Sequence, residues 1–89
     1  MRAVIRQTKF KRDFKNSKRR GKDILKLQNI VQYLVTNGEA PPTSSPHKLG
    51  GKFSGLWECH IETDWLLIYD VSDTEVQLIR TGTHADLFE

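Results

Sequence analysis

The sequence predicts an α+β fold of two layers, in which an antiparallel C-terminal sheet packs on an N-terminal helical hairpin. Apolar residues recur with helical spacing over residues 8–37 and form strand-like runs from residue 56 onward. A segment that contains all three prolines separates the two patterns. Because 89 residues suffice for only one domain, residues 1–89 must share a single core. The expected order is βααβββ, followed by a short C-terminal helix.

The N-terminal elements are expected to be a short strand at residues 2–7 and a basic helix. Thr8 should cap this helix, because its hydroxyl can accept a free backbone N–H. Phe10 and Phe14 are four residues apart, so they share one helix face, and lysine and arginine cover the rest. Gly21 is expected to end the helix, as glycine commonly does at the C′ position.

A second helix is predicted from Asp23 to the Asn37-Gly38 pair. Its apolar positions follow the 3.6-residue period closely: Ile24, Leu27, Ile30, Val31, Leu34 and Val35. The two helices should therefore form an antiparallel hairpin whose apolar stripes face the same core.

Three strands are expected in the C-terminal half, at residues 56–61, 65–71 and 75–81. The three-residue link 72–74 indicates a hairpin between the last two. The middle strand is apolar on both faces, which is typical of a central strand. In the first strand we expect the Trp57 face to meet the helices, so that Cys59 is a buried apolar residue rather than a nucleophile. Residues 39–55 should form an irregular connection, and residues 84–88 one turn of helix.

Composition and cysteine usage exclude several classes of protein. With 37% hydrophobic and 28% charged residues, the chain is far from the composition of a disordered protein. No apolar run approaches the ~18 residues that a membrane span needs. The N-terminal residues contain no apolar stretch long enough for a signal peptide, so we expect none. The single cysteine excludes an internal disulfide and fits a reducing compartment. We therefore expect a cytoplasmic protein with no membrane partner.

Positive charge is concentrated at the N-terminus. Ten of the fourteen lysines and arginines lie in residues 1–22, where Asp13 is the only acid. Such a segment suggests a polyanionic partner, because its cations can neutralise phosphates. The candidate contacts to nucleic acid are Lys9, Lys11, Arg12 and Lys15. A solvated helix face, balanced by the acidic C-terminal half, remains the alternative.

Three histidines are the candidates for proton transfer, since only imidazole titrates near neutral pH without perturbation. His60 precedes Asp64 by four residues, and His84 follows Arg80 by four. If the strands are adjacent, their ends bring these residues together, with His47 in the loop before them. Two titrating groups and an arginine can cleave RNA, because the 2′-hydroxyl is the nucleophile and the guanidinium binds the phosphate.

Two other interpretations of these histidines stay open. Three histidines and an aspartate are good zinc ligands, but no pair has a tight ligand spacing such as HxH or HExxH, so we predict no metal and no cofactor. Alternatively, the histidines are incidental surface residues. Two aromatic residues are equally ambiguous: Trp65 can stack on a base or belong to the core, and Phe88 can stack or cover the sheet edge.

Two segments resemble the YafQ branch of the RelE/ParE toxin superfamily, which comprises mRNA interferases of bacterial type II toxin–antitoxin systems. One segment holds HKLGG from residue 47 and GLWECHIETDWLLIY from residue 55, and the other is LIRTGTHADLF at 78–88. Their joint pattern is specific, whereas the N-terminal half matches only in element order and basic character.

The resemblance implies a RelE-like fold and ribosome-dependent cleavage of mRNA without a metal. It also implies neutralisation by a cognate antitoxin of the RelB/DinJ type, contact with 16S ribosomal RNA, and binding of operator DNA only through the antitoxin complex. The active-site set carried over is His47, His60, Asp64, Trp65, Arg80, His84 and Phe88. Proton transfer falls to His84 with Asp64. Phosphate contacts fall to His47, His60 and Arg80, while Trp65 and Phe88 shape the RNA-binding surface.

Two alternatives to a nuclease remain from the sequence. A ParE-like toxin would inhibit DNA gyrase by binding, without nuclease chemistry, and would need no titrating cluster. A non-catalytic nucleic-acid-binding module would act through the first helix alone.

Overall fold

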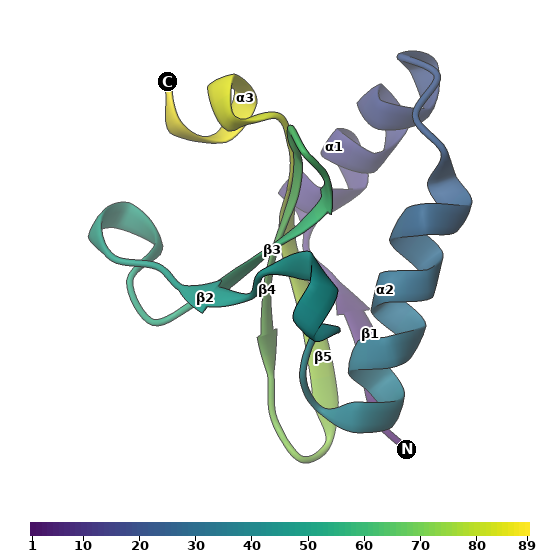
Figure 1. Ribbon diagram of the computed structural model, residues 1–89, viewed down its shortest axis with the longest axis vertical. Helices are drawn as coiled ribbons and strands as arrows, with labels where there is room; N and C mark the ends of the chain where they lie inside the picture. Colours follow the sequence, from purple (N-terminus) through teal and green to yellow (C-terminus); the bar gives the residue numbers. More distant parts are fainter.

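The computed structural model describes residues 1–89 and shows two helices on one face of a five-stranded sheet (Figure 1). The elements are β1 (Ala3–Arg6), α1 (Thr8–Arg19), α2 (Ile24–Asn37), β2 (His47–Lys48), β3 (Trp57–Glu62), β4 (Trp65–Val71), β5 (Glu75–Gly82) and α3 (His84–Phe88). Two 3-10 turns, η1 (Pro42–Ser44) and η2 (Gly51–Phe53), flank β2. The predicted two-layer α+β fold is confirmed.

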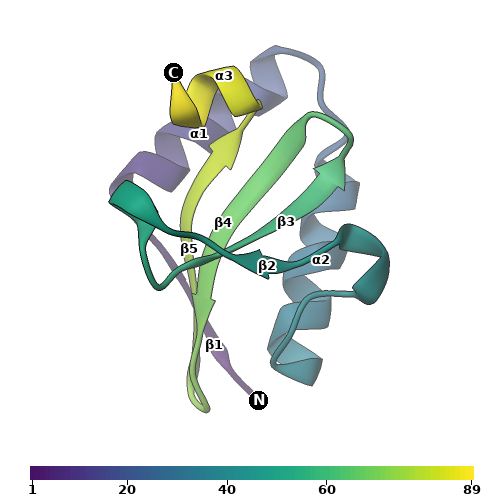
Figure 2. The same ribbon diagram turned by 60° about the vertical axis from the view of Figure 1, so that its left-hand side comes forward.

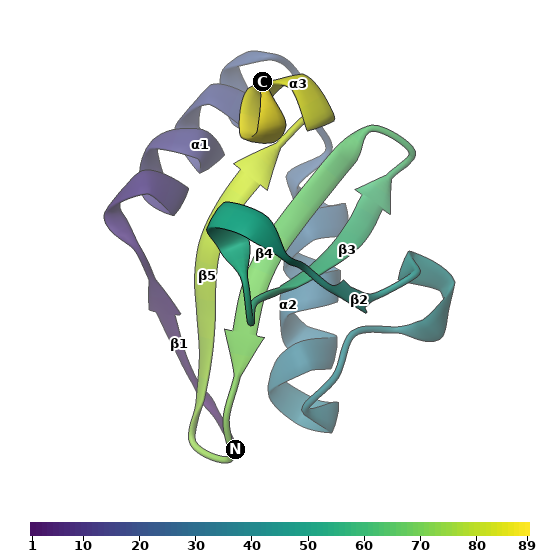
Figure 3. The same ribbon diagram turned by 90° about the vertical axis from the view of Figure 1, so that its left-hand side faces the viewer.

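The sheet has the strand order β1-β5-β4-β3-β2. Strands β2, β3, β4 and β5 pair with one another in antiparallel orientation, as expected for the C-terminal sheet. Strand β1 pairs with β5 in parallel, from Ala3 opposite Glu75 to Arg6 opposite Leu78. Because β1 ends at Arg6, the outer edge of β5 beyond Leu78 has no strand beside it, and α1 lies there instead (Figure 3).

The helix ends follow the sequence signals with one exception. Asp23 caps α2 by accepting a hydrogen bond from the backbone N–H of Leu25 at 3.1 Å. Gly21 and Gly38 follow the two helices with φ of +84° and +76°, a region that glycine adopts without a Cβ clash. The expectation for Thr8 is wrong: the N-cap of α1 is Gln7, which makes no side-chain cap, and Thr8 is the first helical residue.

The main core lies between the helices and the sheet. Its buried residues include Phe10, Leu27 and Leu34 from the helices and Trp65, Leu67 and Tyr69 from β4. Cys59 is fully buried in this core, and Trp57 and Ile61 pack against it, which confirms the predicted inward face of β3. A smaller cluster of Leu66, Ile68 and Leu87 lies on the other side of the sheet. Strand β4 is therefore apolar on both faces, as a central strand must be.

We call the face of the sheet away from α1 and α2 the open face. The chain between α2 and β3 crosses beside it. Figure 2 shows η2 and α3 on this side of the sheet, where Phe53 of η2 contacts Phe88 of α3. The two-residue strand β2 in this connection was not predicted, because a strand that short has no periodicity. None of the helices has the length and apolar character to cross a membrane.

Candidate active site

The register of the strands gathers the predicted site residues on the open face. One row of paired residues runs across the sheet: His47 opposite Glu58, Glu58 opposite Ile68, and Ile68 opposite Arg80. The next row, nearer α3, is made of His60, Leu66 and Gly82. Because residues two apart on a strand share a face, two histidines and the arginine lie on the same face.

Arg80 reaches the open face because of a β-bulge in β5. Tyr69 is opposite Leu78 and Ile68 is opposite Arg80, so Ile79 is an extra residue without a partner on β4. Strict alternation from the buried Leu78 would turn Arg80 toward the helices. The bulge shifts the alternation by one residue and re-aims the arginine, as bulges beside functional sites often do.

His84 is held next to Asp64 at the same end of the sheet. Its backbone N–H donates to Oδ1 of Asp64 at 3.0 Å, which ties the β3–β4 turn to the start of α3. Thr83 and Asp86 form a capping box: the Thr83 hydroxyl accepts from Asp86 N at 3.1 Å, and the Asp86 carboxylate accepts from Thr83 N at 3.0 Å. His84 and Asp64 are both exposed, so a substrate can reach them.

The other two histidines have defined orientations. His60 Nδ1 lies 3.3 Å from the carbonyl oxygen of Thr63, which leaves Nε2 free. His47 Nδ1 lies 3.2 Å from the carbonyl of Ser45, and Nε2 lies 3.2 Å from Oε1 of Glu58. Backbone or side-chain oxygens thus fix both rings.

Glu58 is a site residue that the sequence analysis missed. Its side chain is 7% exposed and contacts His47 through Oε1, while the buried Oε2 has no hydrogen-bond partner. Burial of a carboxylate oxygen without a hydrogen bond is costly. Its position in the sequence could have identified Glu58 as a candidate, because it precedes His60 by two residues on one strand and must share its face.

Asp13 on α1 orients Arg80 and was also not predicted as a site residue. Arg80 Nε donates to Asp13 Oδ2 at 2.6 Å and Nη2 donates to Oδ1 at 3.2 Å. The same carboxylate accepts from Thr81 N at 3.2 Å, at the edge of β5 that β1 leaves unpaired. The hydrogen bonds to Asp13 raise the pKa of Arg80 above its ordinary value, so the guanidinium stays charged.

The structure contradicts the expected role of Trp65 at the RNA-binding surface. Trp65 is 0% exposed, and its Nε1 donates to the Thr81 hydroxyl at 3.0 Å. That hydroxyl donates in turn to the Leu66 carbonyl at 2.7 Å. Trp65 is therefore a core residue that supports the sheet from behind, and it cannot stack on a base.

Phe88 remains at the open face. Its ring centroid lies 4.9 Å from that of His84 and 5.6 Å from that of Phe53, which it meets edge to face. It also packs on the small cluster that holds Leu87. Phe88 therefore covers part of the sheet, and its stacking on a base stays a prediction.

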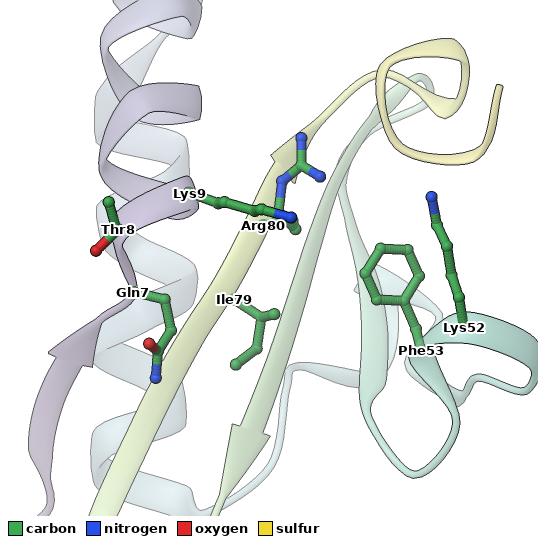
Figure 4. A pocket seen from close by; sticks show the side chains of 7 residues that line it. All are labelled: Gln7, Thr8, Lys9, Lys52, Phe53, Ile79 and Arg80. Carbon is green, nitrogen blue, oxygen red and sulfur yellow. The ribbon is translucent and has the colours of Figure 1, made fainter.

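The basic residues of α1 are accessible, as a role in nucleic-acid binding requires. Lys9, Lys11, Arg12 and Lys15 are exposed, and none of them forms an ion pair. Lys9 lines a cleft with Arg80 (Figure 4). No three His, Cys, Asp or Glu side chains come together in a way that could hold a metal ion. The site combines imidazoles, carboxylates and a guanidinium, a set able to transfer protons and bind a phosphate.

Comparisons with known proteins show the family of this chain. Residues 2–89 match the family described as the bacterial toxin of type II toxin-antitoxin system, YafQ. The mRNA interferase toxin YafQ of Escherichia coli K12 is 38% identical over 80 residues, which are 89% of this chain and 87% of that protein.

Two solved structures have the same fold. One is the E. coli DinJ-YafQ toxin-antitoxin complex, with a TM-score of 0.88, 35% identity and coverage of 99% of this chain and 98% of that chain. The other is a metal-bound toxin from Helicobacter pylori, with a TM-score of 0.88, 31% identity and coverage of 99% and 100%. The chain therefore belongs to the YafQ family of toxins of bacterial type II toxin–antitoxin systems.

Proposed function

We propose that this chain is a cytoplasmic endoribonuclease that cleaves mRNA on the ribosome and thereby inhibits translation. One observation carries the proposal: the hydrogen bond from His84 N to Asp64 joins the end of β5 to the β3–β4 turn, beside His60 on the open face. The named activity of the E. coli relative, an mRNA interferase, supports the same conclusion.

The reaction needs no nucleophile from the protein. The 2′-oxygen of the RNA forms a bond to phosphorus and the bond from phosphorus to the 5′-oxygen breaks, leaving a 2′,3′-cyclic phosphate and a 5′-hydroxyl. Attack of water on the cyclic phosphate, with breakage of the bond from phosphorus to the 2′-oxygen, then gives a 3′ phosphate. One proton leaves the 2′-hydroxyl and one is given to the departing oxygen, which two titrating groups can accomplish.

Each proposed catalytic residue has a stated part in this reaction. His84 and Asp64 transfer the protons. His47, His60 and Arg80 contact the phosphate and stabilise the charge that develops on it. Glu58 orients His47, and Asp13 orients Arg80. Phe88 supplies an aromatic surface for the RNA beside His84.

Two partners follow from the family and from the charge of α1. The accessible cations Lys9, Lys11, Arg12 and Lys15 contact phosphates of 16S ribosomal RNA or of the mRNA. A cognate antitoxin of the RelB/DinJ type neutralises the toxin, which the complex of the E. coli relative with DinJ supports. Binding of operator DNA occurs only through the complex with the antitoxin.

The chemistry is proposed to be independent of metal. The nucleophile belongs to the substrate, so no metal-bound water has to be generated. A metal-bound relative is known from H. pylori, and a metal-dependent reaction is therefore the alternative that experiment must exclude.

The test of the function is the variant His84→Ala. On ribosomes programmed with mRNA we expect cleavage to fall by roughly 10²–10⁴-fold, the usual contribution of an acid–base group, and growth arrest without the antitoxin to disappear. Thr74→Ala, in the turn at the opposite end of the sheet, is the control. Growth arrest by His84→Ala as strong as that of the parent would refute the proposed mechanism.

Assays of DNA gyrase activity and of RNA binding separate the two alternatives from a nuclease. Inhibition of DNA gyrase with intact transcripts would support a ParE-like toxin. Binding to RNA that survives substitution of every histidine, with no cleavage by the parent, would support a non-catalytic module.

A further inference from the structure

A cleft of ≈ 480 Å³ opens beside the active site, between the start of α1 and η2. Figure 4 shows Lys9 on one side, Lys52 and Phe53 on the other, and Ile79 and Arg80 of β5 between them. Arg80 belongs to both the cleft and the row of site residues, so a ligand in the cleft is continuous with the proposed reaction site.

The lining of the cleft is positively charged. Lys9, Lys52 and Arg80 contribute three cations, and no aspartate or glutamate is among the lining residues. The charge of Arg80 is balanced by its ion pair with Asp13, so the excess charge comes from the two lysines. Lys9 and Lys52 are exposed and form no ion pair. Uncompensated cations around a hollow favour an anionic ligand, and a phosphate accepts hydrogen bonds from both lysine and arginine.

An aromatic row connects this cleft to the proposed catalytic histidine. The His84 ring lies 4.9 Å from Phe88, and Phe88 lies 5.6 Å from Phe53. Lys52 Nζ is 5.2 Å from the centroid of the Phe53 ring, so a cation lies beside a partly buried aromatic ring. A free phosphate would use only the cations, whereas a nucleotide uses both, because a base stacks on the ring while its phosphate meets the lysines.

We propose that this cleft binds the mRNA nucleotide next to the scissile phosphate, with its base on Phe53 and its phosphate between Lys9 and Lys52. The inference rests on the proposed function and specifies the substrate contacts of the same site. It assigns binding roles to Lys52 and Phe53, neither of which takes part in the proton transfer.

The aromatic contact is tested with Phe53→Leu and Phe53→Trp on ribosomes programmed with mRNA. Leucine keeps apolar packing on the cluster of Leu66, Ile68 and Leu87 but removes the π-face. Loss of one base stack should raise the half-saturating toxin concentration by about 5- to 140-fold. Phe53→Trp should return this concentration to the value of the parent. Thermal unfolding of each variant verifies that the fold is retained.

The charge contact is tested with Lys52→Gln and Lys52→Arg. Glutamine should weaken binding and arginine should restore it, because both lysine and arginine donate to phosphate. Lys48→Gln is the matched control: it removes the same charge from a nearby exposed lysine, which lies outside the cleft with Nζ 5.9 Å from the Trp57 ring.

An abasic mRNA identifies the occupant. With an abasic residue on one side of the scissile phosphate, Phe53→Leu should have no further effect, since the base that stacks on the ring is already missing. If Phe53→Leu weakens binding equally with abasic residues at either flanking position, the mRNA base is not the occupant and the inference is wrong. Equal effects of Lys52→Gln and Lys48→Gln would also overturn it.

Failure of this inference and failure of the proposed function give different results. A parent protein that cuts mRNA while the Phe53 and Lys52 variants behave like the parent overturns the subsite alone. A parent that does not cut overturns the function. In that case, binding to ribosomes carrying a 2′-O-methyl mRNA still tests the cleft with the same variants.

Discussion

Arg80 depends on two neighbours in different ways. The extra residue Ile79 turns its side chain to the open face, and Asp13 of α1 then accepts two hydrogen bonds from its guanidinium. The side chains of Arg80 and Asp13 are 21% and 12% exposed. The pair is thus shielded from solvent, so removal of the Asp13 charge would leave the Arg80 guanidinium poorly solvated and without a counter-charge.

Asp13→Asn should lower both activity and stability. The amide keeps the shape of the carboxylate but loses its charge, so Arg80 is no longer fixed, and small displacements of a positioning group can cost up to about 10²-fold in rate. We expect at least about a 10-fold slower single-turnover cleavage and a loss of about 1–3 kcal/mol in the free energy of unfolding. Asp73→Asn, in an exposed turn, is the control. An unchanged or faster rate would show that Asp13 does not position Arg80 for the reaction.

Cys59 should be unreactive in the folded protein. Burial raises the pKa of its thiol to about 12, so almost no thiolate forms at pH 8. We expect reaction with a disulfide reagent only at the rate of unfolding, and fast reaction in denaturant. A folded protein that reacts rapidly would contradict the burial of β3 against the helices.

At the scale of elements, the short helix α3 decides where His84 lies. A helix of 5 residues is not stable by itself. It is held by its capping box, by Leu87 in the small cluster, and by an ion pair of 2.6 Å between Asp86 and Arg20 of α1. Helix α1 therefore supports the site twice, through Asp13 at Arg80 and through Arg20 at α3.

The ion pair at α3 predicts a pH dependence of stability. Hydrogen bonds from Arg20, and then from the Thr83 backbone, lower the pKa of Asp86 from 3.8 to about 2. Because the folded-state pKa is lowered, the stabilisation is complete above the unfolded value and is lost as the pH falls from about 4 toward 2.

The size of this effect is limited by solvent. The side chains of Arg20 and Asp86 are 51% and 32% exposed, so screening reduces the contribution to about 1 kcal/mol. Urea unfolding should show Asp86→Asn less stable than the parent by that amount at pH 7, and the difference should shrink below pH ~4. A difference independent of pH between 7 and 3 would assign the effect to helix capping alone.

At the scale of the whole molecule, one face of the sheet forms the core and the opposite face carries the candidate site. One face buries the core with α1 and α2, and the open face carries the row from His47 to Arg80 and the cleft beside it. The basic helix lies along the border of the open face (Figure 3). A polyanion that contacts α1 is thereby placed near the imidazoles, which suits an RNA held on a large ribonucleoprotein.

Metal removal tests the chemistry of the whole site. Protein treated with EDTA and then dialysed, so that the ribosomes keep their magnesium, should cleave mRNA at the rate of the untreated protein. This result is expected because the RNA supplies its own nucleophile. Activity that is lost on treatment and restored by zinc or copper would instead favour a metal-dependent reaction.

The sequence by itself determined the order of all strands and α-helices except β2, the helix stops at Gly21 and Gly38, and the inward face of β3. These features depend on local periodicity and backbone preference, which act over a few residues. The burial of Trp65 could not be predicted in this way. Its strand is apolar on both faces, so periodicity does not indicate which residues face the helices.

Only the tertiary structure decided how the site is assembled. Four features of the site depend on pairings between residues far apart in the chain. They are strand β2, the bulge at Ile79, the burial of Glu58 and the hydrogen bonds from Arg80 to Asp13. A register shift of one residue reverses the face of a side chain, and nothing within β5 itself states which register its neighbours impose.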